Sequence, residues 1–255
     1  LALFFLGFAY ISRLEKLNIN KIEIIGNKVE NKEKLETVLK KEITGNYFWL
    51  FPKANILLYP KNKIEKNLLG QFSRIESISL SIQNQTLKVS LTERTALYTW
   101  CGEMMNLEEE KCYFVNEKGY IFAPAPYFSG EVYFKFYGPI SLQENTPVGS
   151  YFLSDIFLKL ISFKEALSAM GLKPVVLYKD EKENKDIRIL LSRVGTGSTT
   201  PEIIFKADSD LEIIAENLQT ALTTEPLQSN FKNKYTSLEY IDLRFGNKVY
   251  YKFRQ

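Results

Sequence analysis

Two different periods of apolar and polar positions divide the first part of the chain after residue 18. A period of two, typical of half-buried strands, runs through INKIEIIG at 19–26 and through RIESISLSIQNQTLKVSLTER from Arg74 onward. A helical period, with apolar residues three or four apart, follows Asn31 and again follows Pro60. The patterns predict, in order, a strand at 19–26, a helix at about 32–41, a helix opened by Pro60, and strands at 75–82 and 87–91.

Between the two predicted helices lies TGNYFWLFPKANILLYP, which runs from Thr44 to Pro60. This segment carries more large apolar side chains than a loop in water normally does. We therefore expect its Phe, Trp and Leu side chains to cover the core of the first domain.

Residues 95–255 show a larger set of short strands and two helices. The strand-like segments are ALYTWC, CYFVNEKGYIF, EVYFKFYGP, PVVLY, DIRILLSR and EIIFK. A helix is predicted from a cap at Ser154 to a stop at Gly171, and another after Asp210. The predicted fold class is α+β. A strand–helix–helix–strand–strand domain at 19–94 precedes a mixed or antiparallel sheet domain at 95–255, with helices over one sheet face.

The last segment, YIDLRFGNKVYYKFRQ, alternates again, with apolar residues at the odd positions. A Gly-Asn pair interrupts the alternation, which indicates two strands and a turn. A two-residue loop would place Phe245 opposite Lys248 on one face. We therefore predict a three-residue loop at 246–248, which keeps the apolar positions aligned. The final strand, Val249–Phe253, is then expected at the edge of the sheet.

The first residues, LALFFLGFAYI, are apolar and uncharged. As a helix they would span roughly half of a hydrocarbon core of about 30 Å. We interpret residues 1–18 as the C-terminal part of a transmembrane helix or signal anchor with a short linker, helical to about residue 14. The alternative is an N-terminal helix that packs on the domain after it.

The amino-acid composition excludes several classes of functional site, mainly because the residues that they require are absent. The 255 residues carry a net charge of +3 with scattered lysines, which does not favour nucleic-acid binding. There is no histidine, which removes His-based metal sites and Ser-His-Asp triads. The two cysteines, Cys101 and Cys112, are expected to form a disulfide across a hairpin if the compartment is oxidising. Two free buried thiols are the alternative.

No catalytic constellation emerges from the residues. RVGTGSTTPE contains Gly195 and Gly197, but they lie between two strands, so a hairpin tip is favoured over a phosphate loop. The stretch LEEEK at Leu107–Lys111 is interpreted as a solvated acidic loop rather than a cation site. A peptidase with a Ser-Lys dyad stays open as an alternative, because both residue types are abundant. We expect a protein that is not an enzyme and binds no metal, cofactor or small-molecule substrate.

Three stretches resemble the cell-division family FtsQ/DivIB. KIEIIGNKVENKEKL is similar to the opening of that family's POTRA domain, SLTERTALYTW with YFVNEKGYIF to its domain junction, and YIDLRFGNKVYYK to its closing motif. The cysteine pair is not part of the resemblance. The resemblance covers the chain in order and implies a single-pass protein of the cytoplasmic membrane, with a POTRA domain and a β domain outside the cytoplasm. Such a protein is a divisome scaffold that recruits FtsB and FtsL and helps to regulate septal peptidoglycan synthesis.

The closing strand is where this partner would bind. A free sheet edge offers N–H and C=O groups to an incoming strand, and the resemblance implies that FtsB supplies it by β-strand addition. Outward lysines and Arg254 would attract an acidic segment. The expected partner-binding residues are Phe245, Lys248, Val249, Tyr250, Tyr251, Lys252 and Phe253. A plain closing strand protected by its lysines is the alternative for this element. For the whole chain, the alternative is a POTRA-containing component of outer-membrane assembly or secretion.

Overall fold

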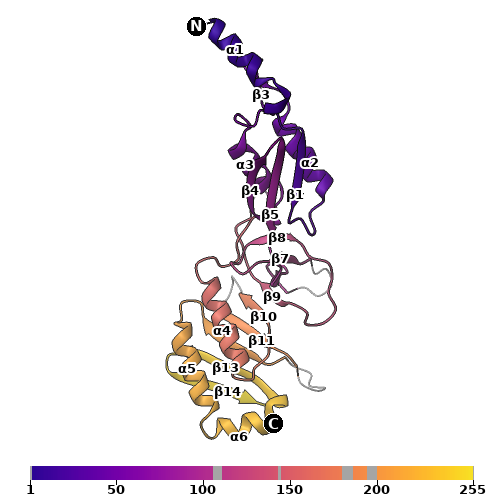
Figure 1. The fold of residues 1–255 in the computed structure, drawn as a ribbon. Helices are drawn as coiled ribbons and strands as arrows, with labels where there is room; N and C mark the ends of the chain where they lie inside the picture. Colours follow the sequence, from indigo (N-terminus) through magenta and orange to yellow (C-terminus); the bar gives the residue numbers. More distant parts are fainter. Residues whose placement is uncertain (1, 106–110, 143–144, 180–185, 194–199, 255) are drawn as a thin grey trace. The chain divides into compact units, whose positions relative to one another are not determined.

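The computed structural model describes residues 2–105, 111–142, 145–179, 186–193 and 200–254. The chain forms two compact units, unit 1 (Leu1–Arg94) and unit 2 (Thr95–Gln255). Each unit combines helices with a sheet (Figure 1), so the α+β class is confirmed.

Unit 1 builds a three-stranded sheet and packs two helices against it. The sheet order is β1 (Lys21–Ile25), β5 (Thr86–Glu93) and β4 (Ile75–Gln83), with β5 parallel to β1 and antiparallel to β4. The helices are α2 (Lys32–Ile43) and α3 (Lys61–Gln71), and a small hairpin of β2 (Asn46–Tyr47) and β3 (Phe51–Pro52) lies between them in the chain. The predicted order of strand, helix, helix, strand and strand is confirmed, with this hairpin as an addition.

The helix signals of unit 1 act as the sequence predicts. Asn31 caps α2, because its side chain accepts a hydrogen bond from the backbone N–H of Lys34 at 2.9 Å. Apolar residues of both helices then meet the inward side chains of the sheet in one buried cluster. Its fully buried members include Leu35, Leu39, Ile64, Leu68 and Leu87. Burial of each such side chain contributes roughly 1.5–3 kcal/mol.

The corner after β1 depends on a glycine and a carboxylate. Gly26 has a φ of +94°, and a Cβ atom there would overlap the carbonyl oxygen of Leu91. The Glu93 carboxylate accepts hydrogen bonds from the next three backbone N–H groups, those of residues 28, 29 and 30, at 2.7, 3.0 and 2.9 Å. Burial raises the pKa of Glu93, but these hydrogen bonds outweigh it and the net pKa is lowered. The corner therefore folds around one ionised side chain.

The segment between α2 and α3 was expected to cover the core with its Phe, Trp and Leu side chains, and this expectation is wrong for most of them. Phe48 and Trp49, at the tip of the β2–β3 hairpin, are 86% and 90% exposed, and Leu57 is 82% exposed. Of this segment, Asn55 is buried, and Ile56 and Tyr59 pack partly buried against the core. The hairpin is too short to produce a recognisable period, so apolar content alone suggested burial.

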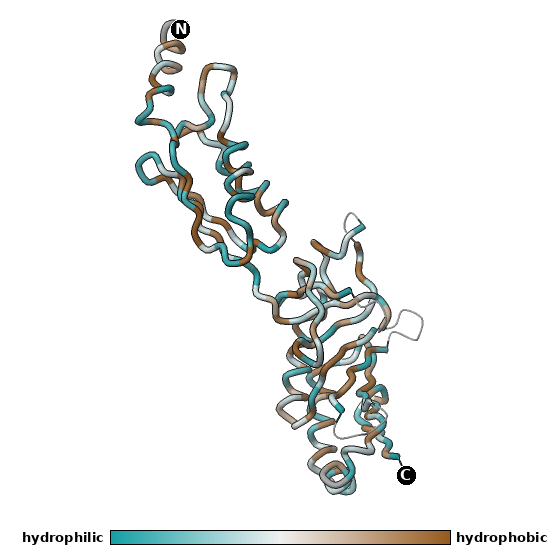
Figure 2. The backbone as a smooth tube through the Cα atoms, turned by 90° about the vertical axis from the view of Figure 1, so that its right-hand side faces the viewer, coloured by the Kyte–Doolittle hydropathy of each residue, from teal (hydrophilic) through white to brown (hydrophobic). Residues whose placement is uncertain are grey.

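The first helix, α1 (Ala2–Ser12), forms as predicted and is drawn largely brown in Figure 2. Phe4, Phe8 and Tyr10 are 75%, 60% and 74% exposed, whereas Ala9 and Ser12 are buried. A helix packed along its length on unit 1 would bury those large side chains. Among the described residues, no helix combines the length and the apolar character needed to cross a membrane.

Unit 2 is built on a mixed sheet of nine strands within the described residues. Its order is β14 (Lys248–Phe253), β13 (Leu238–Phe245), β12 (Glu202–Lys206), β11 (Asp186–Leu191), β10 (Pro174–Lys179), β9 (Phe134–Tyr137), β6 (Tyr98–Trp100), β7 (Tyr113–Val115) and β8 (Ile121–Pro124). The helices are α4 (Phe157–Ala169), α5 (Leu211–Leu222) and α6 (Leu227–Lys234). In Figure 1, α4 and α5 lie side by side over the sheet, as predicted for helices on one face.

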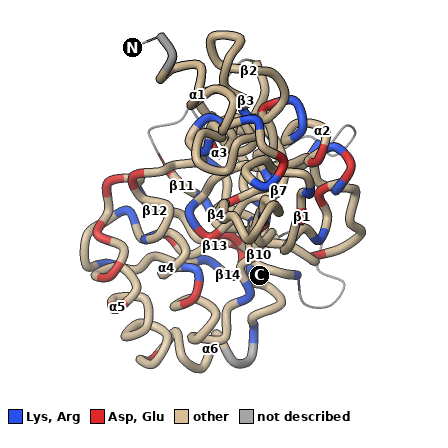
Figure 3. Tube along the Cα trace, turned by 45° about the horizontal axis from the view of Figure 1, so that its top comes forward, with Lys and Arg blue, Asp and Glu red and all other residues tan. Residues whose placement is uncertain are grey.

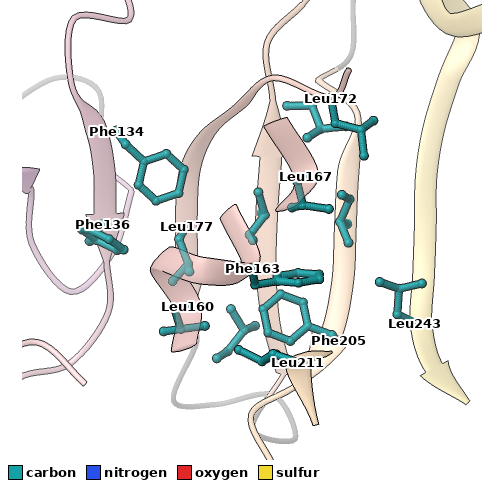
Figure 4. Packing of buried hydrophobic residues seen from close by; sticks show 14 of the residues in the cluster. Phe134, Phe136, Leu160, Phe163, Leu167, Leu172, Leu177, Phe205, Leu211 and Leu243 are labelled. Atoms are coloured by element: carbon teal, nitrogen blue, oxygen red, sulfur yellow. The ribbon is translucent and has the colours of Figure 1, made fainter. Parts of the chain in front are cut away.

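Aromatic and leucine side chains join the helices of unit 2 to its sheet. Figure 4 shows Phe163 of α4 against Phe205 of β12, with ring centroids 5.2 Å apart. The same cluster extends from Phe136 of β9 to Leu243 of β13, and both are buried. Because one core runs under this span of the sheet, the position of β13 is fixed by packing as well as by the ladder.

Two helix details of unit 2 differ from the prediction. Ser154 does not cap α4, which begins three residues later and makes no side-chain cap hydrogen bond; Ser154 bonds to Asp155 instead. The polar segment that forms α6 was not predicted as a helix. Asp210 does cap α5, as expected, by accepting hydrogen bonds from the N–H groups of Glu212 and Ile213 at 3.1 and 3.3 Å.

Candidate functional site at the terminal sheet edge

The chain closes on a hairpin whose last strand is the edge of the unit 2 sheet. β14 stands at one end of the strand order, so the predicted edge position is confirmed. The loop is Gly246-Asn247 and pairs Phe245 with Lys248, so the predicted three-residue loop at 246–248 is wrong. Gly246 has a φ of +65°, and glycine at the first loop position is typical of a type II′ turn.

A bulge in β13 reconciles the short loop with the apolar pattern. Between Asp242 and Phe245, β13 contains Leu243 and Arg244, where β14 contains only Val249. The extra residue shifts the ladder by one position and brings the apolar residues of both strands back to the core face. The sequence argument assumed a regular ladder and therefore assigned the extra residue to the loop.

The side chains of β14 alternate between the core and the solvent. Those that pack against the core of unit 2 are Val249, Tyr251 and Phe253. Those that face solvent are Lys248, Tyr250 and Lys252. Phe245, from β13, and Tyr250 form an exposed aromatic pair with ring centroids 5.1 Å apart. The structure thus brings all seven predicted site residues together on one hairpin.

The backbone of β14 divides its hydrogen-bonding groups between two sides. Just beyond β14, Arg254 donates its N–H to the carbonyl oxygen of Ser237 at 2.8 Å, on the side of β13. Because successive residues of a strand direct their N–H groups to opposite sides, the even-numbered residues bond to β13. The odd-numbered residues Val249, Tyr251 and Phe253 direct theirs to the open side. No strand in the described part of the chain pairs with that side.

The bulge is held by an ion-pair cluster that sequence reasoning missed. Arg244 donates from Nε and Nη2 to the two carboxylate oxygens of Asp242 at 2.9 and 2.6 Å, and from Nη1 to Asp186 of β11 at 2.7 Å. The N–H of Arg244 also donates to Asp242, at 3.1 Å. Both carboxylates are buried, at 6% and 9% exposure. An Asp two residues before an Arg was visible in the sequence, but nothing there indicated that Asp186 joins them.

The cluster shifts the pKa values of Asp242 and Arg244 in opposite directions. Burial raises the pKa of Asp242, but the hydrogen bonds from Arg244 outweigh burial and the net pKa is lowered. The hydrogen bonds to Asp242 and Asp186 raise the pKa of Arg244. Asp242 and Arg244 therefore stay charged at neutral pH, and the hydrogen bond from Arg244 to Asp186 joins β13 to β11 across β12.

Glu239 of β13 modifies the expected positive charge of the edge. Its carboxylate pairs with Lys252 at 2.7 Å and lies 3.7 Å from Nε of Arg254. The hydrogen bond to Glu239 raises the pKa of Lys252. Glu239 therefore offsets part of the charge that the sequence argument attributed to Lys248, Lys252 and Arg254 together.

The cysteines lie elsewhere in unit 2. Cys101 follows β6 and Cys112 precedes β7, and the two form a disulfide with a Cα–Cα distance of 4.0 Å. The structure thus has the expected disulfide and not the two free thiols that were the alternative. The disulfide ties together two strands at the opposite end of the strand order from β14.

The remaining candidate sites add no chemistry to this edge. Gly195, Gly197 and most of the acidic stretch 107–111 lie outside the described residues. Within the described ranges, no group of three or more Cys, Asp or Glu side chains is placed to hold a metal ion. Neither a known protein-family model nor a curated protein sequence matches this chain significantly.

Proposed function

We propose that this protein is a membrane-anchored, non-enzymatic scaffold of the bacterial cell-division machinery. In this proposal α1 belongs to the cytoplasmic membrane, unit 1 is a POTRA domain, and both units lie outside the cytoplasm. The protein recruits an FtsB-like partner, and an FtsL-like one with it, and so helps to regulate septal peptidoglycan synthesis. The resemblance of three sequence segments to the FtsQ/DivIB family is the first support.

The topology of unit 1 is the second support. Strand, helix, helix, strand and strand follow an apolar helix in that order, which is the arrangement that the resemblance implies. Two residues of the segments that resemble the family, Gly26 of the Gly-Asn turn and Glu93 of the Glu-Arg pair, also stabilise the fold of unit 1. Gly26 and Glu93 meet at the same corner of unit 1, where the glycine allows close approach and the carboxylate binds three N–H groups.

The single observation that carries the proposal is the open side of β14. Three residues there direct N–H and C=O groups away from β13, and their side chains anchor the strand on the core. A partner segment in extended conformation can pair with those groups and extend the sheet. The Asp242–Arg244–Asp186 cluster holds the bulge of β13, the strand that pairs with β14. Because β13 is held in this way, less conformational entropy is lost at the sheet edge when a partner binds.

Binding of a purified extracytoplasmic FtsB segment to the 1–255 chain tests this proposal. Val249→Pro removes an N–H on the open side and adds a ring where the partner strand would lie. We expect affinity to fall by at least about tenfold, since one lost hydrogen bond and a steric conflict together exceed about 1.4 kcal/mol. The matched control is Val249→Ala, which shortens the same side chain but keeps the N–H.

Folding must be checked in parallel. In a Trp49→Phe background, the fluorescence of Trp100, which is buried in unit 2, reports whether each variant keeps its native core. If Val249→Pro stays folded and binds the FtsB segment as tightly as Val249→Ala does, strand addition at β14 is refuted. Tyr250→Pro is a poorer probe, because its N–H faces β13 and its loss would open the hairpin itself.

A further inference from the structure

Unit 1 exposes a second apolar surface that the edge-strand mechanism does not use. It comprises the large side chains of α1, the hairpin tip Phe48-Trp49, and Leu57 with Leu58. A groove of about 740 Å³ lies between α1 and the segment 51–58; its lining includes Phe4, Phe8, Ile11, Phe51, Leu57 and Leu58. The tip residues Phe48 and Trp49 do not line this groove, but their hairpin contributes Phe51 to it. We call this surface the apolar platform. Contiguous exposed apolar surface of this kind marks an interaction site in soluble proteins.

The hairpin tip is held away from the core by its backbone. Phe48 and Trp49 have φ values of 47° and 61°, in the left-handed region that side chains other than glycine rarely adopt. The Arg13 guanidinium donates to the carbonyl oxygens of Trp49 and Leu50 at 3.0 and 3.2 Å. The protein therefore maintains a strained conformation that directs two aromatic side chains into the surroundings.

The same hydrogen bonds join the hairpin to the end of α1. Arg13 directly follows the helix, and the buried Asn55 side chain donates to the carbonyl oxygen of Ser12, the last residue of α1, at 3.0 Å. The Asn18 side chain donates to the same carbonyl oxygen, also at 3.0 Å. Trp49 is thus fixed beside the last turn of α1, where an inserted helix would leave the lipid.

The chemistry of the platform fits a lipid surface better than a protein groove. α1 has no charged residue and exposes apolar side chains on several sides, as a helix surrounded by acyl chains does. Trp is enriched at the boundary between acyl chains and headgroups. Arg13, Lys16 and Lys61 are exposed nearby, with Glu15 among them, and Figure 3 shows Lys and Arg on the chain around α3. Basic residues at this level attract anionic headgroups.

We infer that the apolar platform enters the lipid interface, with Phe48, Trp49 and Leu57 among the headgroups beside α1. This inference rests on the membrane position of α1 in the proposed function and adds a second contact to it. With a helix and a hairpin both inserted, unit 1 is held at a fixed tilt to the bilayer instead of swinging on a single tether.

Tryptophan fluorescence of the 1–255 chain in vesicles tests the inference. The chain has two tryptophans, and Trp100 is buried at 5% exposure with its Nε1 bonded to the carbonyl oxygen of Gly138 at 3.0 Å. A change in fluorescence on contact with lipid is therefore a change in the emission of Trp49. In vesicles of phosphatidylcholine and phosphatidylglycerol, we expect the Trp49 emission to shift to the blue and to be quenched when the acyl chains are brominated. Trp49→Phe is the control, and its remaining emission should not respond to bromine.

Flotation of the same samples separates failure of this inference from failure of the membrane anchor. If the chain floats with the vesicles while iodide in the water quenches Trp49 as it does without lipid, the inference is overturned and the anchor stands. If the chain does not float, both are overturned, and strand addition at β14 is judged by its own binding assay. If Trp49 becomes shielded only after a membrane-spanning partner helix is added, the platform binds protein, and the lipid assignment is wrong.

Discussion

Replacement of Arg244 by Met removes the cation that holds the bulge of β13. The guanidinium makes three side-chain hydrogen bonds, to Asp242 and to Asp186, and both carboxylates are buried. The methionine keeps much of the apolar stem but leaves two buried carboxylates without the guanidinium that bonds both of them. Unit 2 should therefore lose stability, and the hairpin that carries β14 should loosen first.

The size of the loss follows from burial. Removal of one partner from a fully buried ion pair costs about 3–5 kcal/mol. The Arg244 side chain is 30% exposed, so water screens part of the interaction, and we reduce the expectation to about 2–3 kcal/mol. For a domain of this size, each kcal/mol lowers the Tm by about 2–4 °C, which predicts a drop of roughly 4–12 °C.

The assay is thermal unfolding followed by Trp100 fluorescence in a Trp49→Phe background, so that the signal reports on unit 2 alone. Lys159→Met is the matched control, because Lys159 is an exposed cation of α4. A loss below about 0.5 kcal/mol for Arg244→Met, equal to that of the control, would refute the assigned role of the cluster, since surface substitutions stay within that range.

The pH dependence gives an independent check on the same cluster. The pKa of Asp242 is lowered in the folded protein, so its stabilisation is complete above the unfolded pKa of about 3.9 and is lost as pH falls through the folded value. Native unit 2 should therefore lose stability below about pH 4. Without Arg244 this acid-dependent loss should shrink, and an unchanged pH profile would contradict the assignment.

Three further changes probe other parts of the chain. Glu93→Gln should cost unit 1 about 1–3 kcal/mol at pH 7. Since the folded pKa of Glu93 is lowered, the difference from the native chain should vanish as pH falls through that value, and urea unfolding at pH 7 and at a series of acidic pH values checks both. Gly26→Ala should destabilise unit 1 by more than Gly45→Ala, because both have positive φ but only Gly26 lies against a carbonyl oxygen; equal urea midpoints would contradict the overlap. Loss of the Cys101–Cys112 disulfide should cost about 2–3 kcal/mol in unit 2, and thiol counting on the unreduced, denatured native chain should find no reactive thiol.

Local patterns were enough to predict most of the secondary structure. Asn31 and Asp210 act as helix caps because a short polar side chain in front of an apolar stripe has one favourable arrangement. The strands β13 and β14 could be predicted from a period of two, because one face of the pair lies on the core. What these elements share is that the determining residues lie within a few positions of each other.

The errors arose where distant residues decide the structure. The bulge at Leu243-Arg244 depends on Asp186, which lies on another strand, so the loop length could not be read from the hairpin alone. Phe48 and Trp49 were expected in the core because apolar content does not reveal which side of a hairpin faces the protein. The hydrogen bonds from Arg13 that hold this hairpin link two segments more than thirty residues apart.

The central claim is that the open side of β14 receives a partner strand, and amide hydrogen exchange measures it most directly. In the free chain, the amides of Lys248, Tyr250 and Lys252 should be protected by β13, whereas those of Val249, Tyr251 and Phe253 should exchange quickly. Addition of the FtsB segment at saturating concentration should protect the second set and leave the first unchanged. If the segment binds and the amides of Val249, Tyr251 and Phe253 still exchange at their free rates, strand addition at this edge is wrong.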